Sequence, residues 1–266
     1  MTSTPGRPAP IASQPPAARM RSLVVPGIAA LLALGILVGL GSWQVSRLAW
    51  KNGLVAQVEQ RTRAPAIPLP GREAWPRMSA ARDDYRKVTV TGRFRHEAEA
   101  YLYHVAGDSR QADRSRPQGQ GYFVLTPLVT AAGDTVLVNR GFVPTDRRDP
   151  ATRAAGQVEG EVSVTGLIRY PEERGLFAAP DDPARRTFYT RDLAVIGRSL
   201  GLDPAGTAPF SVDADATPVP GGLPVGGETR LVFANRHFEY ALTWFGLALT
   251  LVGVFGAYAF QRLRRR

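Results

Sequence analysis

Two long stretches of the sequence are hydrophobic and contain no charged side chain. They cover residues 23–46 and 240–260. At about 1.5 Å of rise per residue, a helix of either length is long enough to cross a hydrocarbon core of about 30 Å. Trp43, Tyr240 and Tyr258 lie near the ends of these stretches, where membrane proteins are enriched in aromatic side chains. The pattern predicts one transmembrane helix near each end of the chain.

Between the two stretches, hydrophobic and polar residues mostly alternate with a period of two, which is typical of half-buried β-strands. Helical spacing first continues through residues 46–61, and a later helix is expected at residues 193–202 with Asp192 as its N-cap. The sequence therefore predicts an α+β membrane protein in which residues 47–239 form a mostly antiparallel β-barrel or sandwich. The expected strands are residues 85–94, 100–105, 121–129, 134–143, 158–170, 210–214 and 228–233.

The positive charge is concentrated at the two ends of the chain. The formal net charge is +10, and residues 1–45 and 261–266 together hold seven arginines and no acidic residue. A nucleic-acid partner is not expected, because such binders carry their charge on the folded domain. Basic residues beside short hydrophobic stretches instead mark the cytoplasmic side of a membrane.

This charge distribution predicts the topology. Residues 1–22 are expected to be a disordered cytoplasmic tail, and residues 261–266 a second, basic cytoplasmic tail. Residues 47–239 then lie on the extracytoplasmic, periplasmic side of an inner membrane. The alternative for the first stretch is a cleaved signal peptide, with Arg19 and Arg21 as its basic segment.

Few residues are suited to catalysis or to binding metal ions. The chain contains no cysteine and three histidines, His96, His104 and His237. No metal-ligand cluster and no catalytic motif is visible, so we expect no catalytic residue, no metal-ion site and no enzymatic activity. A membrane-anchored hydrolase would need His96 or His104 beside a serine such as Ser109 or Ser115.

His237 is the most informative of the three histidines because it directly precedes the second hydrophobic stretch. On a helix, Tyr240 and Trp244 would share its face. An imidazole at the membrane surface beside aromatic side chains is a candidate axial ligand for haem iron. An interfacial histidine that only forms hydrogen bonds fits the same pattern.

Several segments together resemble the surfeit-locus (Surf/Shy) family of cytochrome c oxidase assembly factors, and the chain is taken as a bacterial member. The similarity covers nearly all of residues 40–260, and its specificity comes from the order of the segments. Where the family usually has Asn and Trp, this chain has Arg186 and Phe188. The matching segments are GSWQVSRLAWK (41–51), YRKVTVTGRF (85–94), GYFVLTPL (121–128), VLVNRGFVP (136–144), VEGEVSVTGLIR (158–169), RDL (191–193), VPGGLPVGGETR (219–230) and NRHFEYALTWFGL (235–247).

The resemblance implies a membrane-anchored factor that assists delivery of haem a to the catalytic subunit of cytochrome c oxidase. That subunit, the lipid bilayer and a haem a synthase are the implied partners. Haem a would be held transiently, with His237 as axial ligand and Tyr240 and Trp244 flanking the porphyrin. The cations that could pair with the haem propionates are Arg47, Lys51 and Arg236.

Two further expectations follow from the resemblance. The β domain would dock on the oxidase subunit, with residues 139–144 as one candidate surface and a buried turn as the alternative for that segment. A scaffold that assembles oxidase subunits without binding haem is the alternative function.

Overall fold

The computed structural model describes residues 16–107, 117–229 and 235–264, with residues 16–22 as backbone only. The chain divides into two compact units. The helical unit combines Met1–Val55 with Phe233–Arg266, and the barrel unit is Ala56–Val232.

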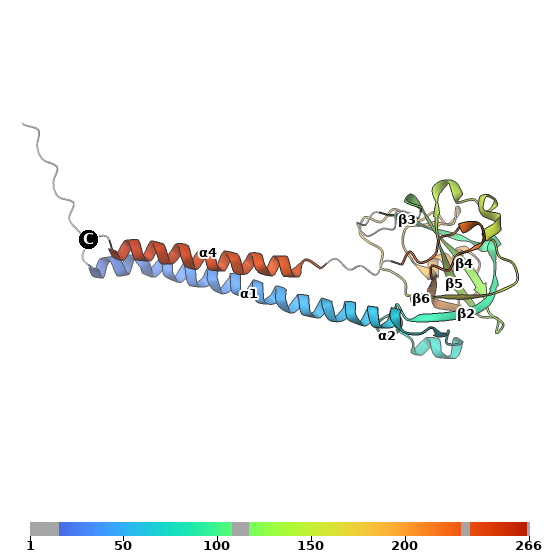
Figure 1. The fold of residues 1–266 in the computed structure, drawn as a ribbon, viewed down its shortest axis with the longest axis horizontal. Helices are drawn as coiled ribbons and strands as arrows, with labels where there is room; N and C mark the ends of the chain where they lie inside the picture. Colours follow the sequence, from blue (N-terminus) through green and yellow to red (C-terminus); the bar gives the residue numbers. More distant parts are fainter. Residues whose placement is uncertain (1–15, 108–116, 230–234, 265–266) are drawn as a thin grey trace, which may run out of the picture. The chain divides into compact units, whose positions relative to one another are not determined.

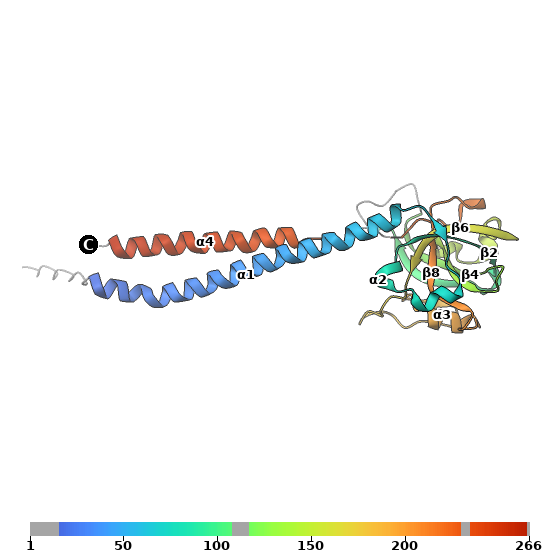
Figure 2. The same cartoon turned by 90° about the horizontal axis from the view of Figure 1, so that it is seen from below.

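The helical unit is a pair of antiparallel helices. Helix α1 spans Pro16–Arg63 and continues into the barrel unit, and helix α4 spans His237–Arg264. Figures 1 and 2 show α4 running beside the N-terminal part of α1 in both views. By length and composition, both helices are candidate membrane spans. Most of their large hydrophobic side chains are exposed, which is the arrangement expected of lipid-facing helices rather than of core helices.

Small residues allow the two helices to approach each other. Ala241 and Ala248 are the buried residues of α4, and Gly41 is buried on α1. A Cβ atom added at Gly41 would lie 2.7 Å from Cε1 of Phe245, so a larger residue there would require that ring to move. Close packing at small residues is a common way for membrane helices to associate.

The barrel unit is built on an eight-stranded sheet in the order β1-β2-β6-β8-β5-β4-β3-β7. Its strands are β1 Ile67–Pro68, β2 Lys87–Phe94, β3 Ala100–Ala106, β4 Gly119–Val129, β5 Thr135–Pro144, β6 Glu161–Arg169, β7 Thr187–Phe188 and β8 Thr207–Ala214. The helices of this unit are α2 Ala80–Asp83, α3 Leu193–Ser199 and the 3-10 helices Arg72–Arg77, His96–Ala98, Thr145–Arg147, Pro150–Gly156 and Pro220–Gly222.

The sheet closes on itself because β2 pairs with β4 as well as with β6. The closing pairs are Arg93 with Val129 and Phe94 with Leu128. A Cβ atom at Gly92 would lie 2.4 Å from the carbonyl oxygen of Val129, so closure at this point requires glycine. The pairings β1–β2, β3–β7 and β5–β8 are parallel, and the remaining pairings are antiparallel. This confirms the predicted α+β class with a mostly antiparallel barrel between two candidate membrane helices.

Alternating residues of the strands fill the interior. On β2, Val88 and Val90 are buried, whereas Thr89 and Thr91 are more accessible and face Thr165 and Ser163 of β6. A separate hydrophobic cluster joins β3, β4 and β5 to helix α3. Its buried side chains are Ala100, Leu102, Ala106, Phe123, Leu125, Leu137, Phe142, Phe188, Leu193, Ile196, Leu200 and Leu202.

Most predicted elements are present. Asp192 caps α3, since its carboxylate accepts hydrogen bonds from the backbone N–H groups of Ala194 and Val195. The expected helical extension through residues 46–61 is part of α1. That helix begins at Pro16, inside the segment that the sequence analysis treats as a tail, while residues 1–15 lie outside the described residues. The expected strand at residues 228–233 also falls largely outside them.

Candidate functional site

His237 is joined to helix α1 by a hydrogen bond. Its Nδ1 atom lies 2.7 Å from Oε1 of Gln44. An amide oxygen only accepts hydrogen bonds, so Nδ1 carries the proton and Nε2 keeps its lone pair. With Nδ1 bonded to Gln44, Nε2 is the ring nitrogen through which His237 could bind a metal.

Asn235 fixes the start of helix α4 next to α1. Its side-chain oxygen accepts a hydrogen bond from the backbone nitrogen of His237 at 3.4 Å, where α4 begins. Its side-chain nitrogen donates to Oδ1 of Asn52 at 2.9 Å. The four residues Gln44, Asn52, Asn235 and His237 form a polar cluster, which we call the hairpin cluster.

The hairpin cluster has the donor chemistry that a haem iron requires. His237 is half-buried, and within the described residues Nε2 has no hydrogen-bond partner. Ligating histidines commonly donate their second ring N–H to a fixed acceptor, which sets the tautomer and orients the ring. Gln44 already occupies that acceptor position, so the residues present fit the predicted axial ligand.

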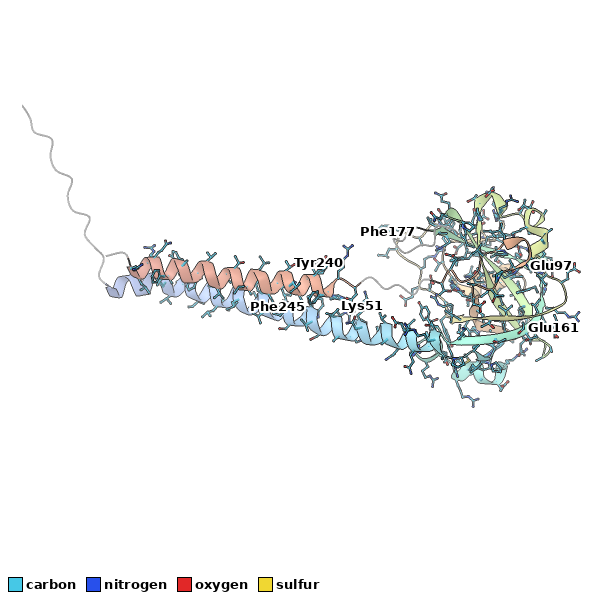
Figure 3. The ribbon with its side chains drawn as sticks, in the orientation of Figure 1. Lys51, Glu97, Glu161, Phe177, Tyr240 and Phe245 are labelled. Atoms are coloured by element: carbon cyan, nitrogen blue, oxygen red, sulfur yellow. The ribbon has the colours of Figure 1, made fainter. Side chains whose placement is uncertain are left out.

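The predicted aromatic residues share a helix with His237. Tyr240 and Trp244 follow it by three and seven residues on α4, so all three lie along one side of the helix. Tyr240 is 53% exposed and Trp244 is half-buried. Figure 3 shows Tyr240 near the start of α4. An apolar ligand could contact both rings from that side.

The predicted cations lie at the same end of the helix pair, but each of them has different surroundings. Arg47 lies with its guanidinium carbon 3.9 Å from the ring centroid of Trp50. Lys51 is half-buried on α1 and has interactions of its own. Arg236 is exposed and precedes His237. Among these candidates, His237 contacts a side chain of the opposite helix, that of Gln44.

The barrel unit contains a buried ionic cluster that the sequence analysis missed. Glu99 is 2% exposed, and both its carboxylate oxygens accept hydrogen bonds from the guanidinium of Arg153. Arg140 donates to Oε1 of Glu99 at 3.2 Å, and Nδ1 of His96 lies 3.9 Å from that oxygen. We call Glu99, Arg140, Arg153 and His96 the ionic cluster.

Its partners determine the protonation of Glu99. Burial raises the pKa of this carboxyl, but His96 and the guanidiniums of Arg153 and Arg140 outweigh burial and lower the pKa to about 2. Burial also lowers the pKa of Arg140, to about 10, although the charge of Glu99 opposes that shift. Glu99 is therefore ionised at neutral pH and anchors two buried arginines.

The ionic cluster changes the interpretation of residues 139–144, the candidate docking surface. Asn139 and Arg140 are each 4% exposed and Phe142 is 1% exposed. The side-chain oxygen of Asn139 accepts from the backbone nitrogen of Gly141, whose φ is +123°. This segment is mostly an interior part of β5, which favours the buried alternative over docking.

The other two histidines, His96 and His104, have contacts that fit a structural role. Nε2 of His96 lies 2.9 Å from the carbonyl oxygen of Val158, and Nδ1 faces the ionic cluster. The ring of His104 stacks on Phe123 with centroids 4.1 Å apart. Ser109 and Ser115, the serines that a hydrolase would need, lie outside the described residues.

Comparison with known proteins identifies relatives along most of the chain. Residues 31–249 match the model of the SURF1 family. Surfeit locus protein 1 of Rattus norvegicus is 39% identical over 215 residues, covering 79% of this chain and 67% of the relative. The protein of the same name from Homo sapiens is 39% identical over 218 residues, covering 79% and 69%. That from Takifugu rubripes is 40% identical over 217 residues, covering 79% and 86%.

Proposed function

The chain belongs to the SURF1 family, and from this premise we propose that it is a membrane-anchored assembly factor for cytochrome c oxidase. In this proposal it holds haem a transiently and presents it to the catalytic subunit. It acts by binding and release rather than by catalysing a reaction. A haem a synthase would be the upstream partner.

The hydrogen bond between His237 and Gln44 is the observation that carries the haem proposal. It leaves Nε2 available as one axial ligand to iron at the end of a hydrophobic helix pair. Haem a is apolar and has a long isoprenoid tail, which lipid beside the helices would accommodate. A single imidazole ligand is suited to transfer because the acceptor subunit can supply a stronger set of ligands.

The remaining candidate residues would orient the porphyrin. Tyr240 and Trp244 offer aromatic surface on the same side of α4, and Arg47, Lys51 and Arg236 supply positive charge for the propionates. The polar edge of the porphyrin would then face the basic end of the helix pair, and the isoprenoid tail would face lipid.

The proposed location is an inner membrane with both termini in the cytoplasm and the barrel unit outside. In this proposal both candidate spans cross the membrane, which puts the segments before α1 and after α4 on one side. The seven arginines in residues 1–45 and 261–266 support the cytoplasm as that side.

The test is the amount of haem a that co-purifies with the protein after His237→Ala. We expect a loss of most bound haem, together with partial recovery when imidazole is added to the purified variant. Phe238→Ala is the matched control, since Phe238 is 58% exposed on the next position of α4 and offers no ligand. Unchanged haem content in His237→Ala would remove His237 from the binding site.

The hairpin cluster also favours a second candidate, a scaffold that assembles oxidase subunits without haem. Its two side-chain hydrogen bonds connect α1 to α4, which is a structural role in itself. A scaffold predicts that the purified wild-type protein is colourless and that His237→Ala lowers only the stability of the helix pair.

A further inference from the structure

The loop between β6 and β7 exposes two large hydrophobic side chains at its tip. Leu176 is 98% exposed and Phe177 is 99% exposed. In the described part of the barrel unit, the only other large hydrophobic residue classed as exposed is Tyr189, at 40%. Every other such residue lies on α1 or α4, the two candidate membrane spans. The loop tip therefore resembles the lipid-facing helices more than the rest of its own unit.

The base of this loop is held by defined contacts. The guanidinium of Arg174 forms an ion pair with Asp181 and donates to the carbonyl of Ala179 at 2.8 Å. The second carboxylate oxygen of Asp181 accepts from the backbone nitrogen of Tyr189 at 2.8 Å. These bonds close the loop and leave Leu176 and Phe177 pointing away from the barrel core.

The surface next to the loop has the composition of a membrane interface. The ring of Tyr189 lies 5.5 Å from that of Tyr103, which contacts Tyr122 at 6.1 Å. The guanidinium carbon of Arg148 lies 5.2 Å from the ring centroid of Tyr122. Tyrosine and arginine side chains at headgroup depth, beside an inserted apolar tip, are typical of interfacial membrane binding.

The covalent connection to the helices limits how far the barrel unit can lie from lipid. Thr229 is bonded to Asp213 in the barrel unit, and the eight residue steps from Thr229 to His237 span at most about 29 Å. Such a short tether gives the bilayer a high effective concentration around the barrel unit, so even a weak apolar contact is populated. Figure 3 shows Phe177 on the side of the barrel unit where the last residues of α1, Ala56–Arg63, enter it.

We propose that Leu176 and Phe177 insert into the lipid interface and form a third membrane contact of this protein, in addition to its two helices. The tyrosines and Arg148 would lie at headgroup depth beside them. This inference does not rest on haem binding. A protein partner that covers the same tip is the competing possibility, and the experiment below separates the two.

The natural absence of cysteine makes the test direct. We would introduce Phe177→Cys into the full chain, label it with an environment-sensitive nitrobenzoxadiazole dye and reconstitute it into phosphatidylcholine–phosphatidylglycerol vesicles. Phosphatidylcholine carrying a doxyl spin label high on its acyl chain serves as the quencher. The matched control is Glu161→Cys, an exposed residue that Figure 3 shows on the opposite side of the barrel unit.

We expect doxyl lipid to quench the dye at position 177 severalfold more than the dye at position 161. Leu176→Cys should behave like Phe177→Cys, and the same difference should persist in a His237→Ala background. Equal quenching at positions 177 and 161 would overturn the proposal. So would a position-177 dye that stays unquenched in lipid and becomes shielded only when the oxidase catalytic subunit is added.

Discussion

At the scale of single residues, Gln44 determines which nitrogen of His237 is available to a metal. The distance of 2.7 Å and the acceptor character of the amide oxygen place the proton on Nδ1. We expect Gln44→Leu to weaken haem retention about 10–100-fold, the usual effect of removing the partner of a ligating histidine. Retention of haem a during purification would measure this.

Gln44→Glu is the informative companion variant. A carboxylate accepts the Nδ1 proton more strongly than an amide, which makes the imidazole a stronger donor to iron. Haem retention should survive in this variant, and the reduction potential of the bound haem should fall. If Gln44→Leu retains haem as well as the wild type, the proposed role of this hydrogen bond is wrong.

The ionic cluster leads to a pH-dependent prediction. The pKa of Glu99 falls from 4.5 to about 2 on folding. Between these values the unfolded chain binds more protons than the folded chain, so the free energy of unfolding increases with pH. The contribution is fully present above about pH 4.5 and is lost as pH falls towards 2, with a size on the order of 3 kcal/mol.

Glu99→Gln should remove most of this pH dependence and destabilise the barrel unit. Two buried guanidiniums, Arg140 and Arg153, would lose their counter-charge, a change that typically costs about 3–5 kcal/mol. Thermal unfolding of the full chain in detergent, followed between pH 3 and pH 7 for both proteins, would measure the difference. The proposed role of Glu99 is wrong if the wild type and Glu99→Gln lose the same amount of stability in acid.

The sequence alone was enough to identify His237 of the hairpin cluster, but not the residues of the ionic cluster. His237 could be singled out because it directly precedes a hydrophobic stretch, and the structure adds the partner, Gln44, which the sequence analysis quoted in a motif without a role. The ionic cluster was missed because Glu99 is 41 residues from Arg140 and 54 from Arg153. The available signal was an arginine inside the apolar run VLVNRGFV.

At the scale of elements, the contact between α1 and α4 depends on Gly41. A Cβ atom there would lie 2.7 Å from Phe245, whereas nothing lies within 4 Å of a Cβ atom at Gly39. We expect Gly41→Ile to destabilise the helix pair by about 1–3 kcal/mol through overpacking. Gly39→Ile on the same helix is the control and should leave the pair intact.

This difference can be followed by disulfide cross-linking of cysteines placed at Asn52 and Asn235, whose side chains form a hydrogen bond in the structure. The yield of cross-linked protein should fall in Gly41→Ile and stay near the parent value in Gly39→Ile. Equal yields in the two variants would contradict packing at Gly41.

The closure of the barrel at Gly92 gives a second prediction at the scale of elements. Gly92→Ala places a methyl group 2.4 Å from the backbone oxygen of Val129, so β2 and β4 must separate at that point. We expect a loss of about 1–3 kcal/mol, measured as a lower midpoint of thermal unfolding. Gly175→Ala is the control because nothing lies within 4 Å of a Cβ atom there. A comparable loss in both variants would show that closure does not depend on Gly92.

Strands with clear alternation were predictable, and very short ones were not. Val88 and Val90 alternate with threonines, which marks β2 and its buried face. Strands β1 and β7 have only two residues each, too few for any period, and both pair in parallel with partners distant in sequence. Barrel closure could not be predicted either, because the pairing of β2 with β4 depends on the tertiary structure.

At the scale of the whole molecule, the proposed topology can be tested in intact bacterial cells expressing the protein. The chain has no natural cysteine. A membrane-impermeant maleimide should label Glu161→Cys in intact cells, and Ser3→Cys only after the cells are broken. The reverse pattern would place the barrel unit in the cytoplasm and contradict the proposed oxidase-facing location.

The hydrogen bond between Gln44 and His237 joins residues 193 positions apart. During synthesis Gln44 emerges early, whereas His237 emerges only after the whole barrel sequence has been made. The hairpin cluster is therefore completed only after the barrel sequence, and a nascent chain shorter than 237 residues lacks the imidazole of His237. Under the proposed function, a nascent chain could not accept haem before residue 237 has been made, so shorter copies would not capture it.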